Sequence, residues 1–266
     1  MEINKTYNEN CLKTMSSMND NFVDLTVTSP PYDNLRTYNG YDFDFESIAK
    51  ELYRVTKEGG VVVWVVGDAT IKGSESGTSF RQALYFKEIG FNLHDTMIWH
   101  KTNAMPNISK KRYTPSFEYM FILSKGQSKV WNRITENCKY AGKTIQTHTT
   151  NKESMMGYKN RKETKKVKPL QNIWGIKVFG TNYGHPAIFP EQLANDHIIS
   201  WSNEGDLVYD CFMGSGTTAK MSIVNKRNWI GSEISAEYCK IAKARIDKAL
   251  EQKKQADAQT KLFWNL

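Results

Sequence analysis

The chain has 266 residues, of which 39% are hydrophobic, and 36 lysines and arginines against 28 aspartates and glutamates give a net charge of +8. A chain of this size and composition can bury a full core, which excludes a disordered, collagen-like or low-complexity protein as an overall description. Its longest apolar run, Val61 to Val66, is too short to span a bilayer, and its first residues lack the apolar stretch of a secretory signal.

Strand and helix patterns alternate along the first part of the chain. We expect strands over 22–27, 61–66, 96–99 and 118–123, with helices over 48–55 and 79–88 between them. The first strand ends at Thr28-Ser29-Pro30-Pro31-Tyr32. In a parallel sheet this segment projects at the carboxyl edge, where ligands bind.

The Ser29-Pro30-Pro31-Tyr32 segment combines a rigid loop with an aromatic ring. The two prolines fix φ and remove two backbone donors, so carbonyl groups are left to accept hydrogen bonds. Tyr32 offers a flat stacking face, and the combination suits the exocyclic amino group of a flipped-out base. A rigid turn with a tyrosine in the core is the alternative interpretation of these four residues alone.

The positive charge is concentrated in the middle third of the chain. Residues 1–99 have a net charge of −5, residues 100–184 of +13, and residues 185–266 of zero. The candidate nucleic-acid-binding residues in this block are Lys110, Lys111, Arg112, Arg161, Lys162, Lys165 and Lys166. A basic surface interleaved with aromatic residues suits a polyanion because Lys and Arg release counterions from phosphates. A solvated basic loop is the alternative.

The alternation of strands and helices resumes after the basic block. We expect helices over 190–201, 217–225 and 236–249 and strands over 207–211 and 228–233, with the chain fraying from about residue 252. The whole pattern predicts an α/β fold with a mostly parallel, doubly wound, Rossmann-like sheet. Region 125–184 has little periodicity, so we expect it to be an insertion outside the sheet.

A glycine loop lies between the last two expected strands. The segment 210–218 places Gly214-Ser215-Gly216 directly between a strand and a helix. Glycines there let the backbone approach a ligand, and the helix N-terminus offers N–H groups to an anion. Glu233 follows Gly216 by 17 residues, near the spacing at which a carboxylate binds a ribose diol. Ala219 replaces the third glycine of the dinucleotide fingerprint, which favours a nucleoside cofactor without a pyrophosphate.

Together these motifs resemble those of the amino-methylating DNA methyltransferases that use S-adenosyl-L-methionine. Residues 29–32 match the family's catalytic motif, (Asp/Asn/Ser)-Pro-Pro-(Tyr/Phe), and residues 210–218 match its cofactor motif, Asp-Pro-Phe-x-Gly-Ser-Gly-Thr-Thr. His185 to Glu191 is similar to the segment that helps to shape the methionine pocket. The order of the motifs is that of the permuted β-class, and the resemblance covers about residues 3–124 and 185–250.

The resemblance implies a division of the chain and a set of site residues. Residues 1–124 would be the catalytic half, 125–184 a target-recognition insertion, and 185–266 the cofactor-binding half. The implied catalytic residues are Ser29, Pro30, Pro31 and Tyr32. The implied cofactor-binding residues are Asn10, Cys11, Asp210, Phe212, Gly214, Ser215, Gly216, Thr217 and Glu233.

The chain departs from the family pattern at three places. Cys211 replaces a proline of the cofactor motif, which changes the rigidity of the loop. Asn10 stands where a carboxylate usually receives the adenine amino group, so we expect weaker cofactor binding rather than its loss. Residues 125–184 match nothing in the family that can be carried over.

The implied reaction needs no metal, covalent intermediate or strong base. The target base would stack on Tyr32 and donate hydrogen bonds from its amino group to Ser29 Oγ and the Pro30 carbonyl. The nitrogen would then attack the sulfonium methyl group, so that catalysis depends on positioning and electrostatics. In this family a leading serine tends to go with N4 of cytosine, and N6 of adenine is the alternative.

The resemblance also carries partner and location predictions. It implies double-stranded DNA as substrate, is compatible with a homodimer and a cognate restriction endonuclease, and predicts a cytoplasmic protein of a prokaryotic cell or phage-infected host, without membrane association. An RNA base methyltransferase is the rival enzyme, but there the cofactor motif usually comes first. A nucleic-acid-binding protein with a vestigial cofactor pocket is the rival non-enzyme. The four cysteines have no Cys-x-x-Cys pair and the histidines no ligand spacing, so we expect no metal site.

Overall fold

The computed structural model describes residues 1–31, 43–106, 111–139, 141–142, 144–149, 158–163, 165–178 and 190–263, with backbone alone for 144–149, 158–163 and 260–263. The chain forms two compact units. The larger one comprises Met1–Asn132 and Asn172–Leu266, and the smaller one comprises Arg133–Gln171.

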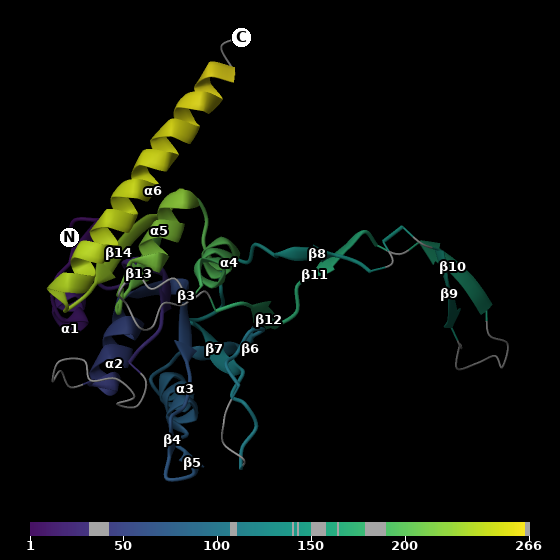
Figure 1. The fold of residues 1–266 in the computed structure, drawn as a ribbon, viewed down its shortest axis with the longest axis horizontal. Helices are drawn as coiled ribbons and strands as arrows, with labels where there is room; N and C mark the ends of the chain where they lie inside the picture. The colour runs from purple at the N-terminus through teal and green to yellow at the C-terminus, as the bar shows by residue number, and fades with distance from the viewer. Residues whose placement is uncertain are drawn as a thin grey trace. The chain divides into compact units, whose positions relative to one another are not determined.

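The larger unit is built around an eight-stranded sheet with the order β1-β14-β13-β2-β3-β7-β6-β12 (Figure 1). Its strands span Lys5–Tyr7 (β1), Val23–Thr28 (β2), Thr56–Val66 (β3), Asn92–Lys101 (β6), Phe117–Ser124 (β7), Ile173–Ile176 (β12), Leu207–Asp210 (β13) and Asn228–Ser232 (β14). Neighbouring strands of this sheet are parallel except at β7, which runs antiparallel to both β3 and β6. The predicted mostly parallel sheet is confirmed.

Helices cover both faces of the sheet. The first group consists of α1 (Cys11–Ser16), α2 (Phe45–Val55) and α3 (Thr78–Glu88), and the second of α4 (Glu191–Trp201), α5 (Thr217–Val224) and α6 (Ala236–Phe263). In β14, Trp229 packs in the cluster formed by α5 and α6, whereas its neighbour Ile230 packs in the cluster formed by α1 to α3. Successive side chains of a strand point to opposite faces, so the fold is doubly wound, as predicted.

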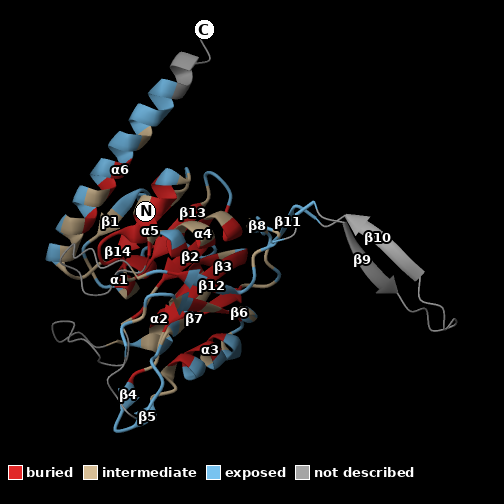
Figure 2. Cartoon of the chain, turned by 45° about the vertical axis from the view of Figure 1, so that its right-hand side comes forward, coloured by how far each residue is buried: buried red, intermediate tan, exposed pale blue. Residues whose placement is uncertain are grey.

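The core beneath α2 and α3 is aromatic. Trp64 of β3 is fully buried, and its Nε1 donates a hydrogen bond of 2.9 Å to Gln82 Oε1 on α3. Its ring centroid lies 5.9 Å from that of Phe45, 5.2 Å from that of Phe86 and 6.2 Å from that of Phe212. Phe212 belongs to the loop after β13, so this loop is anchored to the core, whose central strands are buried (Figure 2).

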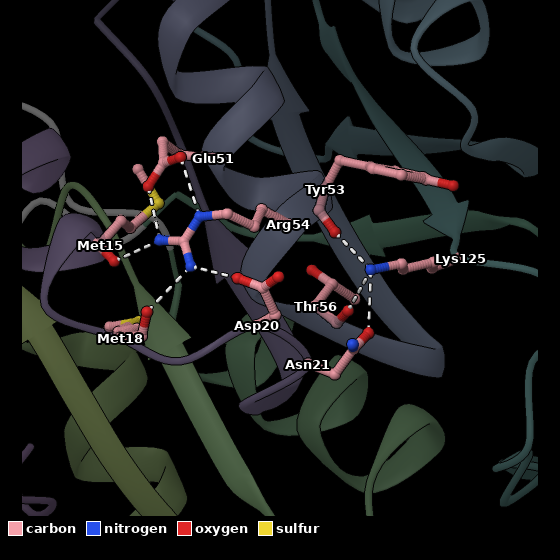
Figure 3. A network of polar contacts seen from close by, with 9 residues as sticks. All are labelled: Met15, Met18, Asp20, Asn21, Glu51, Tyr53, Arg54, Thr56 and Lys125. Carbon is pink, nitrogen blue, oxygen red and sulfur yellow. Dashed lines mark hydrogen bonds and ion pairs between the residues drawn. The ribbon is translucent and has the colours of Figure 1, made fainter.

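Two cations join α1, α2 and the start of β3 at the amino edge of the sheet (Figure 3). Arg54 donates to the backbone oxygens of Met15 and Met18 and to the carboxylates of Asp20 and Glu51, at 2.7 to 3.0 Å. Lys125 donates to the backbone oxygens of Tyr53 and Thr56 and to Asn21 Oδ1, at 2.8 to 3.0 Å. The last carbonyls of a helix lack hydrogen-bond donors within that helix. Arg54 donates to one such carbonyl at the end of α1, and Lys125 donates to one at the end of α2.

Short strands make up the remaining described structure. β4 (Thr70–Ile71) and β5 (Ser74–Glu75) form a hairpin after β3. In the smaller unit β8 (Thr135–Asn137) pairs with β11 (Val167–Pro169), and β9 (Thr144–Thr149) pairs with β10 (Tyr158–Glu163), both antiparallel. The domain boundaries at 124/125 and 184/185 stay a prediction.

Some elements differ from the sequence-based expectation. β12 lies inside the region expected to be outside the sheet, and it pairs in parallel with β6. That expectation is wrong for Ile173–Ile176, because a four-residue edge strand leaves too short a pattern to detect. α6 continues to Phe263 instead of fraying from residue 252, since its last turns consist of good helix formers such as Lys, Gln and Ala. None of the helices in the described ranges is long and apolar enough to cross a membrane.

Candidate active site

The two candidate loops leave neighbouring strands at the centre of the sheet. β2 and β13 are parallel, with Leu25 opposite Val208 and Thr26 opposite Tyr209. Their carboxyl ends therefore lie side by side, and the serine-proline loop and the glycine loop leave the same edge. At that edge Thr28 Oγ1 donates a hydrogen bond of 2.7 Å to Asp210 Oδ1. The fold thus joins two motifs that are far apart in the sequence.

Asp210 is the buried acidic group of this junction. It is 2% exposed, and its Oδ1 also accepts the backbone N–H of Phe212 at 3.1 Å. Burial raises the pKa of Asp210 to about 6, against the opposing effect of the hydrogen bonds from Thr28 and Phe212. The next residue, Cys211, is also buried, and its thiol donates to Thr28 Oγ1 at 3.5 Å. Burial raises the pKa of Cys211 well above its usual range, so it is a neutral packing group.

The glycine loop has the backbone conformation that its sequence predicts. Gly214 and Gly216 have φ values of 49° and 79°, in the left-handed region that favours glycine. Gly216 is the N-cap of α5, and no side chain caps this helix, so the N–H groups of its first turn face the loop. A Cβ at Gly216 would lie 3.1 Å from that of Ala242, so the packing of α6 as well as the positive φ favours a glycine here.

Glu233 fastens the glycine loop to the end of β14. Its Oε2 accepts the backbone N–H of Gly214 at 2.8 Å, and its Oε1 accepts that of Ser235 at 2.8 Å. Burial raises the pKa of Glu233, while these backbone hydrogen bonds favour its charged form. Each carboxylate oxygen accepts more than one hydrogen bond, so the group fits the hydroxyls of a ribose as well as the loop.

Ser215 and Thr217 direct their hydroxyl groups toward α6. Arg245 donates to Ser215 Oγ at 2.6 Å, to the Ser215 backbone oxygen at 2.7 Å, and to Thr217 Oγ1 at 3.2 Å. Sequence reasoning placed both residues in the cofactor site and did not single out Arg245. A detectable signal was its helical register with Ile241 and Ala242, which places it on the face of α6 that packs inward.

Asn10 and Cys11 form the start of α1. Asn10 is the N-cap of this helix, and its Oδ1 accepts the backbone N–H of Leu12 at 2.8 Å. The oxygen that we expected to receive an adenine amino group therefore already accepts one hydrogen bond. Cys11 is buried in the core, and burial raises the pKa of its thiol to about 12.

The serine-proline loop is only partly within the described residues. Ser29 and Pro31 are half-buried and Pro30 is buried, whereas Tyr32 and the segment 185–189 lie outside the described residues. A carboxylate that sequence reasoning missed follows the neighbouring strand β3. Asp68 accepts the backbone N–H of Ser79 at 2.9 Å and its hydroxyl at 2.5 Å. It thereby caps α3, whose own N-cap residue is a glycine.

The predicted nucleic-acid-binding residues have different surroundings. Lys111, Lys165 and Lys166 are exposed, while Lys110 lies outside the described residues. Arg112 is engaged with the β4–β5 turn, where it donates to the Gly73 carbonyl and lies 3.6 Å from the Glu75 carboxylate. Arg161 and Lys162 belong to β10, opposite Gln146 and Ile145 of β9.

Within the part of the chain that the structure describes, no group of three His, Cys, Asp or Glu residues could hold a metal ion. His197 is fully buried on α4, with its Nε2 3.3 Å from Met120 Sδ and its ring centroid 4.5 Å from that of Trp174. Burial lowers the pKa of His197 to about 3, which makes it a neutral core residue.

Comparison with known proteins places this geometry in context. The family model described as DNA methylase matches residues 23–244. The chain is 54% identical over 253 residues to the orphan methyltransferase M.BamHII of Bacillus amyloliquefaciens, which covers 86% of this chain and 91% of that protein.

Solved structures match over nearly the whole chain. The PvuII DNA methyltransferase, described as cytosine-N4-specific, has a TM-score of 0.70 at 23% identity, covering 91% of this chain and 85% of its own. TTHA0409 of Thermus thermophilus, described as a putative DNA modification methylase and complexed with S-adenosyl-L-methionine, has a TM-score of 0.63 at 21% identity, covering 92% of this chain and 94% of its own. At these identities the structural matches show a shared fold.

Proposed function

This chain belongs to the β-class of the N6- and N4-amino-methylating DNA methylases, and from that premise we propose that it methylates N4 of cytosine in double-stranded DNA. It is a DNA methyltransferase that uses S-adenosyl-L-methionine. The proposal concerns the target atom, the flipping of the base, and the residues that carry the reaction.

The observation that carries the proposal is the junction of β2 and β13. The Thr28 hydroxyl donates to Asp210 at 2.7 Å, and the Thr218 hydroxyl donates to the Val27 carbonyl at 3.2 Å. Each of these bonds joins a residue that leads into the Ser29 loop to one in the cofactor motif. A base held by the first loop and a cofactor held by the second would therefore meet at one edge of the sheet.

The residues at this edge fit the cofactor. S-Adenosyl-L-methionine supplies an electrophilic methyl group on a sulfonium when it is bound. Glu233 would orient the ribose hydroxyls, since its two oxygens retain lone pairs beside the bonds to Gly214 and Ser235. The loop Phe212 to Gly216 would line the site with backbone, because its glycines leave no Cβ between backbone and ligand.

Ser29 and Pro30 would hold the target amino group. An amine conjugated to a ring is a weak nucleophile because its lone pair is delocalised. The Ser29 hydroxyl oxygen and the Pro30 carbonyl would accept its two N–H groups and favour a pyramidal nitrogen whose lone pair points at the methyl group. Stacking on Tyr32 would fix the plane of the base outside the duplex. As the bond from nitrogen to the methyl carbon forms, the bond from that carbon to sulfur would break and leave a neutral thioether. The positive charge would then be on the nitrogen until one of its protons leaves to solvent.

Serine at position 29 favours cytosine over adenine. A neutral hydroxyl is a weaker acceptor than the carboxylate or amide found elsewhere in the family, and in the resemblance that motivates this proposal a leading serine goes with N4 of cytosine. N6 of adenine is the second candidate. Mass spectrometry of nucleosides from DNA incubated with the protein separates the two products, and methyladenine without methylcytosine would overturn the assignment.

Ser29→Ala tests the catalytic role directly. We expect turnover to fall about 100-fold, because one preorganised partner of the reacting group is lost. The dissociation constant for S-adenosyl-L-methionine, measured by calorimetry, should stay within about twofold. Ser16→Ala is the matched control, since Ser16 lies at the end of α1 and its hydroxyl donates to the Lys13 carbonyl of the same helix. Equal loss of turnover and cofactor binding in Ser29→Ala would refute the role.

The basic block would bind the phosphates around the target. The larger unit supplies the exposed Lys111, and the smaller unit supplies the exposed Lys165 and Lys166 together with Arg161 and Lys162 of β10. A competition assay with RNA tests the substrate class, since preferential methylation of RNA would contradict DNA as the target. A homodimer and a cognate endonuclease remain predictions of the resemblance, and analytical ultracentrifugation tests the first.

A further inference from the structure

Arg245 is a residue of α6 whose side chain contacts the glycine loop. Its side chain is 11% exposed, and one guanidinium nitrogen, Nη1, bonds Ser215 Oγ, the Ser215 carbonyl and Thr217 Oγ1 within 3.2 Å. Ala242, one turn earlier on α6, packs against Gly216. The loop is therefore held from one side by a single helix, with polar contacts from Arg245 and an apolar contact from Ala242.

The second guanidinium nitrogen of Arg245 reaches the first turn of α4. Nη2 donates to Glu191 Oε1 at 2.9 Å, and Lys220 of α5 donates to the same oxygen at 2.6 Å. These two cations hold the pKa of Glu191 below its usual range, although burial acts in the opposite direction and is the largest single effect. One side chain thus connects the starts of α4 and α5 with the body of α6.

The placement of this cation has an electrostatic cost. The N-terminus of α5 carries the positive end of the helix dipole, where a guanidinium is unfavourable. Glu191 compensates the charge, and its own position in the first turn of α4 is favourable for a carboxylate. The pair of Arg245 and Glu191 has a structural benefit that offsets this cost. It orders the loop in which Gly214 and Gly216 have left-handed conformations.

We propose that Arg245, paired with Glu191, is a positioning residue for the cofactor loop. It touches Ser215 and Thr217, and it acts on S-adenosyl-L-methionine only through the backbone of 214–217, so the inference rests on the proposed cofactor role of that loop. Glycine loses more backbone conformational entropy on ordering than any other residue. If the loop were not held by other residues, the cost of ordering it would reduce the affinity for the cofactor. Arg245 holds the loop in its binding conformation before the ligand arrives.

Arg245→Met tests this proposal, because methionine preserves the aliphatic length and removes every donor. We expect the dissociation constant for S-adenosyl-L-methionine, measured by calorimetry, to rise at least tenfold. Turnover at saturating cofactor should stay within about threefold, since Arg245 does not contact the reacting atoms. Arg245→Lys restores a cation without the two-pronged geometry, and its dissociation constant should fall between those of wild type and Arg245→Met.

Arg54→Met is the matched control. Arg54 is also a partly buried arginine that bonds backbone oxygens and carboxylates, but it does so at the amino edge of the sheet (Figure 3). Its loss should lower the melting temperature and leave the dissociation constant within about twofold of wild type. If Arg245→Met behaves in the same way, with lower stability and unchanged cofactor affinity, Arg245 is merely structural and the proposal is wrong.

A second variant keeps the test decisive if Arg245→Met does not fold. Glu191 is 40% exposed, so Glu191→Gln removes its charge with little disturbance of packing. We expect a rise of about threefold to tenfold in the dissociation constant, and no change would overturn the proposal. A wild-type protein that does not bind S-adenosyl-L-methionine would contradict the proposed function itself, which is a different result from equal affinity in wild type and variants.

Discussion

Replacing Asp210 by Asn should change how the stability of the protein depends on pH. Asp210 is 2% exposed beneath the junction of the two loops, and burial raises its pKa to about 6 from an ordinary value of 3.8. Between these values the folded protein retains a proton that the unfolded chain has released. The free energy of unfolding therefore falls as the pH rises through this window and is level above it.

The size of the effect follows from the shift. A change of about two pKa units corresponds to about 3 kcal/mol, at 1.36 kcal/mol per unit. Asparagine has no proton to release in this range, and its side-chain oxygen can still accept from the Thr28 hydroxyl and the Phe212 N–H. The stability of Asp210→Asn relative to wild type should thus rise by about 2 kcal/mol between pH 4 and pH 8, because the unfolded carboxyl has already lost part of its proton at pH 4.

Urea unfolding at a series of pH values measures this difference directly. The other titratable groups are the same in both proteins, so their contributions cancel in the difference between the two free energies of unfolding. The packing of the asparagine amide changes this difference by a constant that does not vary with pH. Thr28→Val removes a donor that lowers the pKa of Asp210 in the folded protein, so the pH range over which stability falls should extend to higher pH. Parallel stability curves for wild type and Asp210→Asn would refute the buried-carboxylate argument.

Two further changes probe the loop support and the basic region. Gly231→Ala would place a Cβ 2.0 Å from Met213 Sδ, and we expect a loss of about 1 to 3 kcal/mol in urea unfolding, which Met213→Ala in the same chain should relieve. No loss in the single variant would show that the Met213 side chain moves freely. Changing Lys162, Lys165 and Lys166 to Gln should lower the salt slope of DNA binding by up to about 2.7, measured by fluorescence anisotropy. An unchanged slope would show that these three lysines do not contact phosphates.

The strands and helices of the sheet were predictable where their patterns are long. Val61 to Val66 is an uninterrupted β-branched and aromatic run, and α2 places Ile48, Leu52 and Val55 on one face, so both periods are evident in the sequence. The three-residue β1 and four-residue β12 are too short to show a period, and pairing with β14 and β6 decides their structure. Short edge strands depend on a partner that local sequence does not reveal.

The motifs of the candidate site were predictable from the sequence, but the residues that hold its loops in place were not. Glycines between a strand and a helix, followed by Glu233, reveal a loop and its acidic residue from spacing alone. The helical register of Arg245 indicates only that it faces inward, and it does not reveal its partners Ser215 and Glu191, which lie 30 and 54 residues away in sequence. Ser215 and Thr217 were placed in the site because they belong to the motif, whereas the structure turns their hydroxyls to α6.

The order of the motifs along the chain is free because the edge of the sheet fixes the site. Chemistry between the two loops requires only that β2 and β13 be parallel neighbours, and the Thr28–Asp210 bond is the consequence of that pairing. The chain between these strands can therefore be long, and here it contains Arg133–Gln171, a unit with its own strands. β2 and β13 both belong to the larger unit, so their pairing includes no residue of Arg133–Gln171. In the proposed function, a basic region can thus diverge to recognise different DNA while the central strands keep the two loops at one edge of the sheet.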